Sequence, residues 1–484
     1  MKNYPLIKNV SLLALLAVLA ILIAGYHPGA EDDEVYLAAI KHDLNPLLFP
    51  HDSEFFTVQL QATVFDELIA SSVRLTRLPL NYVELAWHYL AILLVLWGCW
   101  RISCRCFVER HAHWAAVSLV TVLLTLPVAG SALYLVDQNL HPRALATAAI
   151  LAAIVAILDR RYWTAGGLLI LAVAIHPIMA SFGISFCVLL GWGQPRLGTT
   201  SMCLVLMPLG WIFEPTSVAW RAAAQTRDYY FLGRWEWYEW LGVLAPFVFL
   251  WWFRAIGKRA SPTLEHLSTR LAIYGGFQLL VALIVMARRN LERLWPLQPM
   301  RYLHLLYLLF AVLGGGLLGQ KVLKKHWWRW LALFVPLAAG MFYAQRRTYP
   351  ASSHLEWPST HSRNSWVEAF LWIRGHSPAD SHFALGADYM RRPGEDYHGF
   401  RALAERSVLA DADKDSAVAT QVPRLASRWF EEVEAQRGWE HFGAADFQRL
   451  KSRFGVNWIV VDQPGPPYLQ CPFENSAVRV CHLE

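Results

Sequence analysis

The sequence predicts a polytopic α-helical membrane protein of about eleven transmembrane helices, followed by a C-terminal soluble α/β domain. Hydrophobic residues make up 55% of the 484 residues and charged residues only 17%, and the mean hydropathy is +0.30. The apolar content is higher, and the charged content lower, than in an ordinary soluble protein. Long apolar runs recur up to residue 344, and the composition then turns polar. The pattern excludes a soluble cytosolic enzyme.

The candidate spans are apolar runs of roughly 17 to 25 residues, some of them shorter, which is the length that crosses a bilayer. They begin near residues 9, 84, 114, 144, 164, 178, 199, 238, 270, 302 and 327. The first run could pass for a signal peptide. Because Gly25-Tyr26-His27-Pro28 and further spans follow it instead of a clear cleavage site, we expect an uncleaved first helix.

The basic residues between the spans predict the orientation of the chain. With the N-terminus in the cytoplasm, every predicted inner loop is basic, as the positive-inside rule requires. The basic residues of the four predicted inner loops are, loop by loop, Arg101, Arg105 and Arg110; Arg160 and Arg161; Arg254, Lys258 and Arg259; and Lys321, Lys324 and Lys325. The net charge of +6 therefore reports sidedness in the bilayer and not binding to nucleic acid.

We expect the transmembrane domain at residues 1–344, including a long outer loop at 27–82 with amphipathic helices, and the soluble extracytoplasmic domain at 345–484. About 140 residues suffice for a separate core. Helical spacing at 365–374 and 446–454, and apolar runs at 382–385 and 456–461, predict a small α/β module. Its two cysteines, Cys471 and Cys481, are expected to form a disulfide.

Four consecutive acids, Glu31, Asp32, Asp33 and Glu34, follow the first span at the outer membrane surface. One interpretation is that they complement the N-terminus of the helix that begins near Val35. A helix start needs only one or two acids, however, and adjacent carboxylates repel each other and raise some of their pKa values. A catalytic base for a reacting hydroxyl, or the ligands of a divalent cation, would each explain the cluster, and both alternatives stay open.

The first helix, the acidic motif just outside it, the long outer loop, the eleven spans and the outer C-terminal domain together resemble the GT-C superfamily of polyprenyl-phosphate-dependent membrane glycosyltransferases. Residues 25–56 also resemble the opening of a bacterial branch near that superfamily. The resemblance implies the outer face of a bacterial cytoplasmic membrane, a polyprenyl-phosphate-linked sugar as donor, a base in the first outer loop and a second acid in the next. The matching positions are Asp32 and Asp33, flanked by Glu31 and Glu34, and then Asp137. Many members have an acid pair, so four acids leave open which one is the base.

A predicted outer loop at 287–301 carries four arginines and one glutamate, against the positive-inside pattern. Such charge is tolerated late in a chain, with Glu292 and lipid headgroups as partners. Alternatively, Arg288, Arg289 and Arg301 hold the phosphate of a polyprenyl lipid, since the guanidinium fork matches phosphate bidentately. His176 raises a similar choice between capping the helix that starts at Pro177 and reaching a substrate site.

Three functions are consistent with these patterns. The first is an inverting glycosyltransferase, with the acceptor unknown, a metal undecided and no certain cofactor. The second is a transporter or flippase of a lipid-linked or anionic solute, although such proteins usually carry internal repeats and charges at mid-membrane. The third is a noncatalytic membrane scaffold whose outer domain binds a partner.

Overall fold

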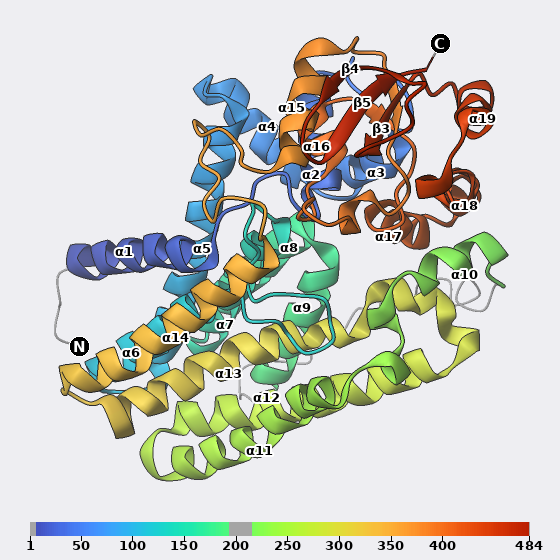
Figure 1. Ribbon diagram of the computed structural model, residues 1–484. Coiled ribbons are helices and arrows are strands. Elements are labelled where there is room, and N and C mark those ends of the chain that lie inside the picture. Colours follow the sequence, from blue (N-terminus) through green and yellow to red (C-terminus); the bar gives the residue numbers. More distant parts are fainter. Residues whose placement is uncertain (1–5, 193–214, 484) are drawn as a thin grey trace. The chain divides into compact units, whose positions relative to one another are not determined.

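The computed structural model describes residues 6–192 and 215–483 (Figure 1). The chain divides into two compact units. The first comprises Met1–Gly25, Ala86–Pro215 and Asp228–Gln345, and the second comprises Tyr26–Leu85, Thr216–Arg227 and Arg346–Glu484. The first outer loop, which the sequence analysis grouped with the spans, thus folds together with the C-terminal residues.

The first unit is helical. Its helices are α1 (Leu6–Ala24), most of α5 (Leu80–Cys106), α6 (Arg110–Val122), α7 (Pro142–Leu158), α8 (Tyr162–Ile175), α9 (Pro177–Gly191), α11 (Trp237–Ala260), α12 (Pro262–Ala287), α13 (Tyr302–Leu318) and α14 (Trp327–Thr348). Short helical turns join them at η2 (Asp228–Tyr230), η3 (Leu232–Arg234), η4 (Arg289–Leu297), η5 (Pro299–Arg301) and η6 (Gly319–Leu323).

Five helical segments of the described residues are long and apolar enough to cross a membrane: Ile7–Ala24, Leu80–Cys106, Trp237–Ala260, Pro262–Ala287 and Pro299–Leu323. Helices α7, α8 and α9 are apolar but shorter. The fold is therefore that of a multi-pass membrane protein. Eleven spans are not confirmed: α6 and α14 are not among these segments, and the span expected near residue 199 lies outside the described residues.

Close packing of α13 against α6 depends on small residues. A Cβ atom added to Gly315 would lie 2.8 Å from the Cα atom of Ala116, and one added to Gly319 would lie 2.8 Å from the Cα atom of Ala112. Two glycines four residues apart on one helix face let helix backbones approach each other closely, as in many membrane helix pairs.

The second unit has a five-stranded sheet in the order β2-β1-β3-β5-β4. The strands are β1 (His382–Ala384), β2 (Ser407–Val408), β3 (Trp458–Asp462), β4 (Gln470–Glu474) and β5 (Val478–His482). Strand β1 is parallel to β2 and β3, whereas β5 is antiparallel to β3 and β4. The predicted strands at 382–385 and 456–461 are confirmed as β1 and β3, and Cys471 forms a disulfide with Cys481 between β4 and β5.

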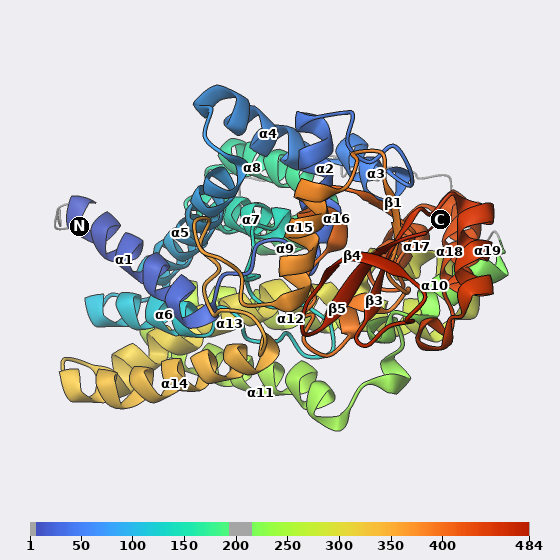
Figure 2. The same cartoon turned by 45° about the horizontal axis from the view of Figure 1, so that its top comes forward.

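Helices cover both faces of this sheet (Figure 2). Trp366 and Phe370 of α15 (Ser365–His376) and Phe400 of α16 (Phe400–Ala404) form one apolar cluster with the strands, and Phe447 and Leu450 of α19 (Ala444–Phe454) form the other. The remaining elements are α17 (Lys414–Gln421), α18 (Ala426–Ala435), η7 (Tyr389–Arg391), η8 (Pro423–Leu425) and η9 (Trp439–His441). The predicted helices at 365–374 and 446–454 are confirmed as α15 and α19.

The outer-loop part of the second unit contains α2 (Asp33–Leu44), α3 (Glu54–Ala62) and α4 (Phe65–Thr76), and α10 (Val218–Gln225) comes from a later loop. Helix α2 packs against α16 and α17. Isolated backbone bridges also join Tyr26 to Leu355 and Ala30 to His398. These contacts hold the acidic motif against the C-terminal residues.

Candidate functional site

Two of the four predicted acids share one cation. The Lys414 ammonium forms ion pairs with Glu31 and, at 2.9 Å, with Asp32. Burial lowers the pKa of Lys414, but the two carboxylates raise it by more, so this lysine keeps its proton. Asp32 is also the residue before α2, yet its side chain makes no capping hydrogen bond. Repulsion between the first two acids is therefore offset by a cation from α17.

Glu34 lies in a buried ionic network. Its carboxylate is 3.1 Å from Nη1 of Arg401 and accepts a hydrogen bond from the Arg401 backbone N–H at 2.7 Å. The same guanidinium pairs with Asp415 at 2.8 Å, and all three side chains are at most 1% exposed. Because a buried charge needs partners of opposite sign, Arg401 binds α2 to α17.

Asp33, the first residue of α2, is in a different environment from its neighbours. It is 2% exposed, and its Oδ2 atom accepts a hydrogen bond from the backbone N–H of Gly29 at 2.8 Å. Gly29 has a φ of +83°, in the left-handed region that favours glycine, and this turn points its N–H at the carboxylate. This amide donor orients the Asp33 carboxylate.

The Glu356 carboxylate lies between two histidines, of which His27 shortly precedes the acidic motif in the chain. Oε2 of Glu356 is 2.9 Å from Nδ1 of His27 and 3.1 Å from Nε2 of His398. Burial raises the pKa of Glu356, but the histidines lower it more, to about 2. Burial lowers the pKa of His398, and Glu356 raises it above its ordinary value, whereas the pKa of His27 is lowered by burial. The arrangement favours a charged His398 beside a neutral His27.

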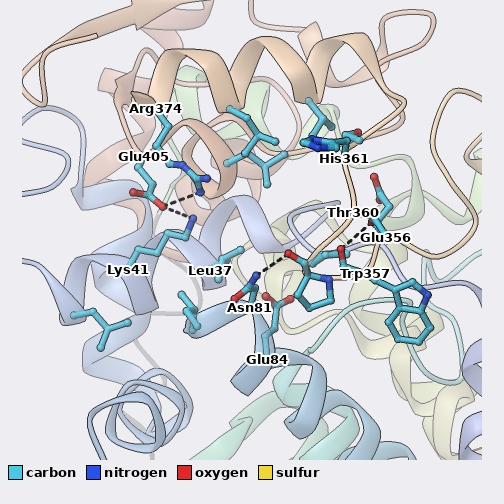
Figure 3. Close-up of a pocket in the computed structure, with 18 of the residues that line it drawn as sticks. Leu37, Lys41, Asn81, Glu84, Glu356, Trp357, Thr360, His361, Arg374 and Glu405 are labelled. Atoms are coloured by element: carbon cyan, nitrogen blue, oxygen red, sulfur yellow. Dashed lines mark hydrogen bonds and ion pairs between the residues drawn. The ribbon is translucent and has the colours of Figure 1, made fainter. Parts of the chain in front are cut away.

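The second unit contains a cavity of about 600 Å³ (Figure 3). Residues of α2, the start of α5, the 356–362 segment, α15 and α16 line it. Figure 3 shows Lys41 and Arg374 converging on Glu405, and the distances are 2.7 Å and 3.5 Å. Burial lowers the pKa of Lys41, and Glu405 opposes this effect. One end of the cavity is thus an ionic cluster in which two cations share one carboxylate.

Glu84, near the N-terminal end of α5, also lines this cavity. Its side chain is 3% exposed, and its Oε1 atom is buried without a hydrogen-bond partner. The charges of Asp33 and Lys41 act on this carboxyl group. A buried polar group in this condition requires an explanation, because the loss of hydration is not compensated within the chain.

A second polar cluster lies in the first unit and contains two predicted site residues. Asp137 forms an ion pair with Arg143 at 3.3 Å, and Arg143 lies 3.1 Å from the ring of His141. That ring stacks on His176 with centroids 6.1 Å apart. His176 also caps α9 by accepting the Met179 backbone N–H, which is the capping role that Pro177 suggested. The structure therefore brings Asp137 and His176, both predicted as site residues, into one cluster.

The arginines of the 287–301 loop are dispersed. Arg288 and Arg289 are exposed at the start of η4, and no acidic side chain within the described ranges pairs with either. Arg301 is half-buried before α13 and acts electrostatically on His304, whose ring is also within the field of Asp137 and Arg143. Arg301 is therefore associated with the buried cluster, and Arg288 and Arg289 with the surface.

The sequence left open whether the four acids bind a divalent cation. Within residues 6–192 and 215–483, no group of three or more histidine, cysteine or acidic residues is arranged to hold a metal ion. Sequence reasoning missed Lys414, Arg401, Glu84 and Arg143. Glu84 carried a signal, since an acid at the start of an apolar helix is costly and commonly functional. Lys414 and Arg401 lie more than 360 residues from the acids that they bind, and no sequence pattern pointed to them.

No family model matches this sequence, and no curated protein matches it. Solved structures do resemble its fold, at 11–13% sequence identity. The oligosaccharyltransferase of Archaeoglobus fulgidus in the apo form has a TM-score of 0.48 and 11% identity, over 95% of this chain and 70% of that chain. The archaeal oligosaccharyltransferase AglB from the same organism, in complex with an inhibitory peptide and a dolichol-phosphate, has a TM-score of 0.49 and 13% identity, over 94% and 69%.

The arabinofuranosyltransferase AftD from Mycobacteria has a TM-score of 0.46 and 12% identity, over 98% of this chain and 40% of that chain. At this level of similarity, no residue role is carried over from these structures to this chain.

Proposed function

We propose that this protein is a membrane glycosyltransferase that takes a sugar from a polyprenyl-phosphate donor and transfers it to an acceptor on the outer face of a bacterial cytoplasmic membrane. The observation that carries the proposal is the fixed geometry of the acidic motif, whose carboxylates are held by partners within the second unit. Glu31 and Asp32 pair with Lys414, Glu34 pairs with Arg401, and Asp33 accepts the N–H of Gly29. A general base must be held in a defined orientation, and we propose Asp33, which the Gly29 turn orients, for this role.

In the proposed reaction, Asp33 takes the proton of the acceptor hydroxyl while the hydroxyl oxygen attacks the anomeric carbon. A new C–O bond forms to the acceptor, the C–O bond to the phosphate breaks, and its electron pair leaves with the polyprenyl phosphate. Cations near the departing oxygen stabilise its charge. In this proposal, the exposed guanidinium groups of Arg288 and Arg289 bind the lipid phosphate. Asp137 is the second acid, and it lies in one cluster with Arg143 and His176.

The proposed topology is the one that the basic loops support: eleven spans, the N-terminus in the cytoplasm, and the C-terminal residues outside. A disulfide in the C-terminal part suits an oxidising compartment. The proposed domain assignment follows from this orientation, with residues 1–344 as the transmembrane part and 345–484 as the extracytoplasmic part.

The test is reconstitution in proteoliposomes with a panel of undecaprenyl-phosphate hexoses and pentoses labelled in the sugar. We expect release of undecaprenyl phosphate and loss of the labelled donor, at a rate that depends on an added cell-envelope glycan acceptor. Movement of the intact donor across the bilayer without cleavage would instead indicate a flippase. If no donor is cleaved or moved, the result would contradict the transferase and favour the noncatalytic membrane scaffold.

A further inference from the structure

The turn that joins α13 to α14 in the first unit is strongly basic (Figure 1). Lys321, Lys324 and Lys325 are all exposed there, and the sequence has no acidic residue between Glu292 and Glu356. Among the described residues, no carboxylate forms an ion pair with any of these three lysines. The turn therefore carries positive charge that the neighbouring chain does not neutralise.

An open cavity of about 430 Å³ lies at this turn. It is lined by Lys324, Lys325, Trp327, Trp330 and Leu331. Its volume is within the range of about 300–1,000 Å³ that holds small ligands. Trp327 is 73% exposed and Leu331 is 53% exposed, so the first turns of α14 present apolar surface outward. The cavity thus combines two ammonium groups with an apolar wall.

Backbone hydrogen bonds fix the shape of the turn. The Lys324 N–H donates to the Gly319 carbonyl at 2.8 Å, and the indole N–H of Trp330 donates to the Lys324 carbonyl at 3.3 Å. The Arg329 guanidinium donates to the Val322 carbonyl at 2.6 Å. These donors bind carbonyl groups that the end of a helix leaves open. The indole is thus held against the lysine backbone, while the lysine ammonium groups take no part in these contacts.

The charge and the apolar wall together favour an anionic phospholipid. Its phosphate complements the two lysines, and the N-terminus of α14 adds partial positive charge, since its first turn contains no acid. A free phosphate ion would leave Trp327 and Leu331 in water, whereas an acyl chain covers them, and indoles are enriched at the level of lipid headgroups. A zwitterionic lipid would bring its own ammonium group close to the lysines, so a lipid with net negative charge fits better.

We propose that this cavity binds one anionic phospholipid, with the phosphate held by Lys324 and Lys325 and an acyl chain packed against Trp327, Trp330 and Leu331. The assignment does not depend on the proposed transfer reaction. In the proposed topology, the site faces the cytoplasmic leaflet and anchors the α13–α14 turn in it.

The test is native mass spectrometry of the full chain in detergent, titrated with phosphatidylglycerol or with phosphatidylethanolamine of the same acyl chains. The first phosphatidylglycerol should bind about tenfold or more tightly than the first phosphatidylethanolamine. Lys324→Gln/Lys325→Gln should weaken phosphatidylglycerol binding about tenfold or more, because each lysine near an anionic headgroup contributes about 1 kcal/mol. Both positions are exposed, so this variant should keep the unfolding midpoint of wild type.

Three comparisons separate this site from a general effect of charge. Lys258→Gln/Arg259→Gln removes the same charge from exposed positions in the last turn of α11 and should bind phosphatidylglycerol as wild type does. Trp327→Ala removes part of the apolar wall and should weaken binding about fivefold. An excess of inorganic phosphate should not displace the lipid.

Four results would overturn the proposal. They are equal affinity of wild type for the two lipids, equal phosphatidylglycerol affinity of wild type and Lys324→Gln/Lys325→Gln, an equal loss in the Lys258→Gln/Arg259→Gln control, and displacement by inorganic phosphate. The last result would assign the lysines to a free anion.

Discussion

Arg401 and Glu34 form a buried ion pair although 367 residues separate them in the chain. The guanidinium also pairs with Asp415, so one cation binds two carboxyl groups that no water reaches. Through this pair the helix that follows the acidic motif is fixed to the C-terminal residues, and Asp33 is held beside Glu34. The acidic motif therefore stabilises the second unit through Glu34 and also contains the proposed catalytic base, Asp33.

Arg401→Met should lower the free energy of unfolding of the second unit by about 3–5 kcal/mol, because it leaves two buried carboxylates without their cation. The measurement is thermal unfolding in detergent, monitored by tryptophan fluorescence. Arg424→Met, at an exposed arginine of η8, is the matched control and should change the midpoint little. A loss no greater than that of the control would contradict the account of the pair.

Stability should depend on pH through the Glu356–His398 pair. The pKa of His398 is raised in the folded state, so its contribution is fully present below its unfolded pKa of about 6.5 and is lost as the pH rises through the folded value. The pKa of Glu356 is about 2, so its contribution is present above about 4.5 and is lost as the pH falls toward 2.

The corresponding variant is His398→Asn, measured as the unfolding midpoint from pH 5 to pH 9. The difference from wild type should be largest near pH 5–6 and should narrow above pH 6.5. His361→Asn, at an exposed histidine, should give a pH profile parallel to that of wild type. A His398→Asn profile that also runs parallel to wild type would show that His398 does not titrate in this window.

The sequence predicted the parts of this molecule that depend on local pattern. Long apolar runs indicated the helices around residues 9, 84, 238, 270 and 302, and short apolar runs at 382–385 and 456–461 indicated two strands of the sheet. The acidic motif was visible because its four residues are adjacent. Its position just outside the first apolar run marked the start of the outer loop.

The partners of those acids could not be predicted, because ion pairs between distant segments leave no local signature. Lys414 and Arg401 are two basic residues among 43. Their identification requires the packing of α2 against α16 and α17. The same packing separates Asp33 from its three neighbours in environment, which the sequence alone left undecided. The compact unit that residues 26–85 form with the C-terminal part has no local signature for the same reason, since long-range contacts create it.

The exposed arginines at 288 and 289 are expected to retain a lipid phosphate. Native mass spectrometry of the protein in nanodiscs from bacterial membranes should detect bound polyprenyl phosphate or its sugar adduct. Arg288→Ala/Arg289→Ala should reduce retention about tenfold or more, because two charge-assisted contacts are lost. Lys258→Ala/Arg259→Ala, which removes an exposed basic pair from the last turn of α11, should retain the lipid. Equal retention by both double variants would assign these arginines to headgroup contacts only.

The orientation of the chain can be tested through its cysteines. In intact cells, Cys471 and Cys481 should react with a membrane-impermeant maleimide only after reduction, because the disulfide joins them on the outer side. Cys104, a partly exposed free cysteine at a predicted inner loop, should react only after the membrane is permeabilised. Each site is measured in a variant without the other cysteines. Labelling of the reduced Cys471 and Cys481 pair only after permeabilisation would reverse the proposed topology.

The most direct test of the account compares Asp33→Asn with Asp32→Asn in the donor-cleavage assay. The two variants remove one charge each from adjacent positions, and both should keep the unfolding midpoint close to that of wild type. If Asp33 is the base, Asp33→Asn should lower the transfer rate about 10²–10⁴-fold. Asp32→Asn should stay within about threefold of wild type, because Lys414 keeps Glu31 as its second partner. A folded Asp33→Asn variant that transfers sugar at the wild-type rate, or an equal loss in both variants, would contradict the central claim.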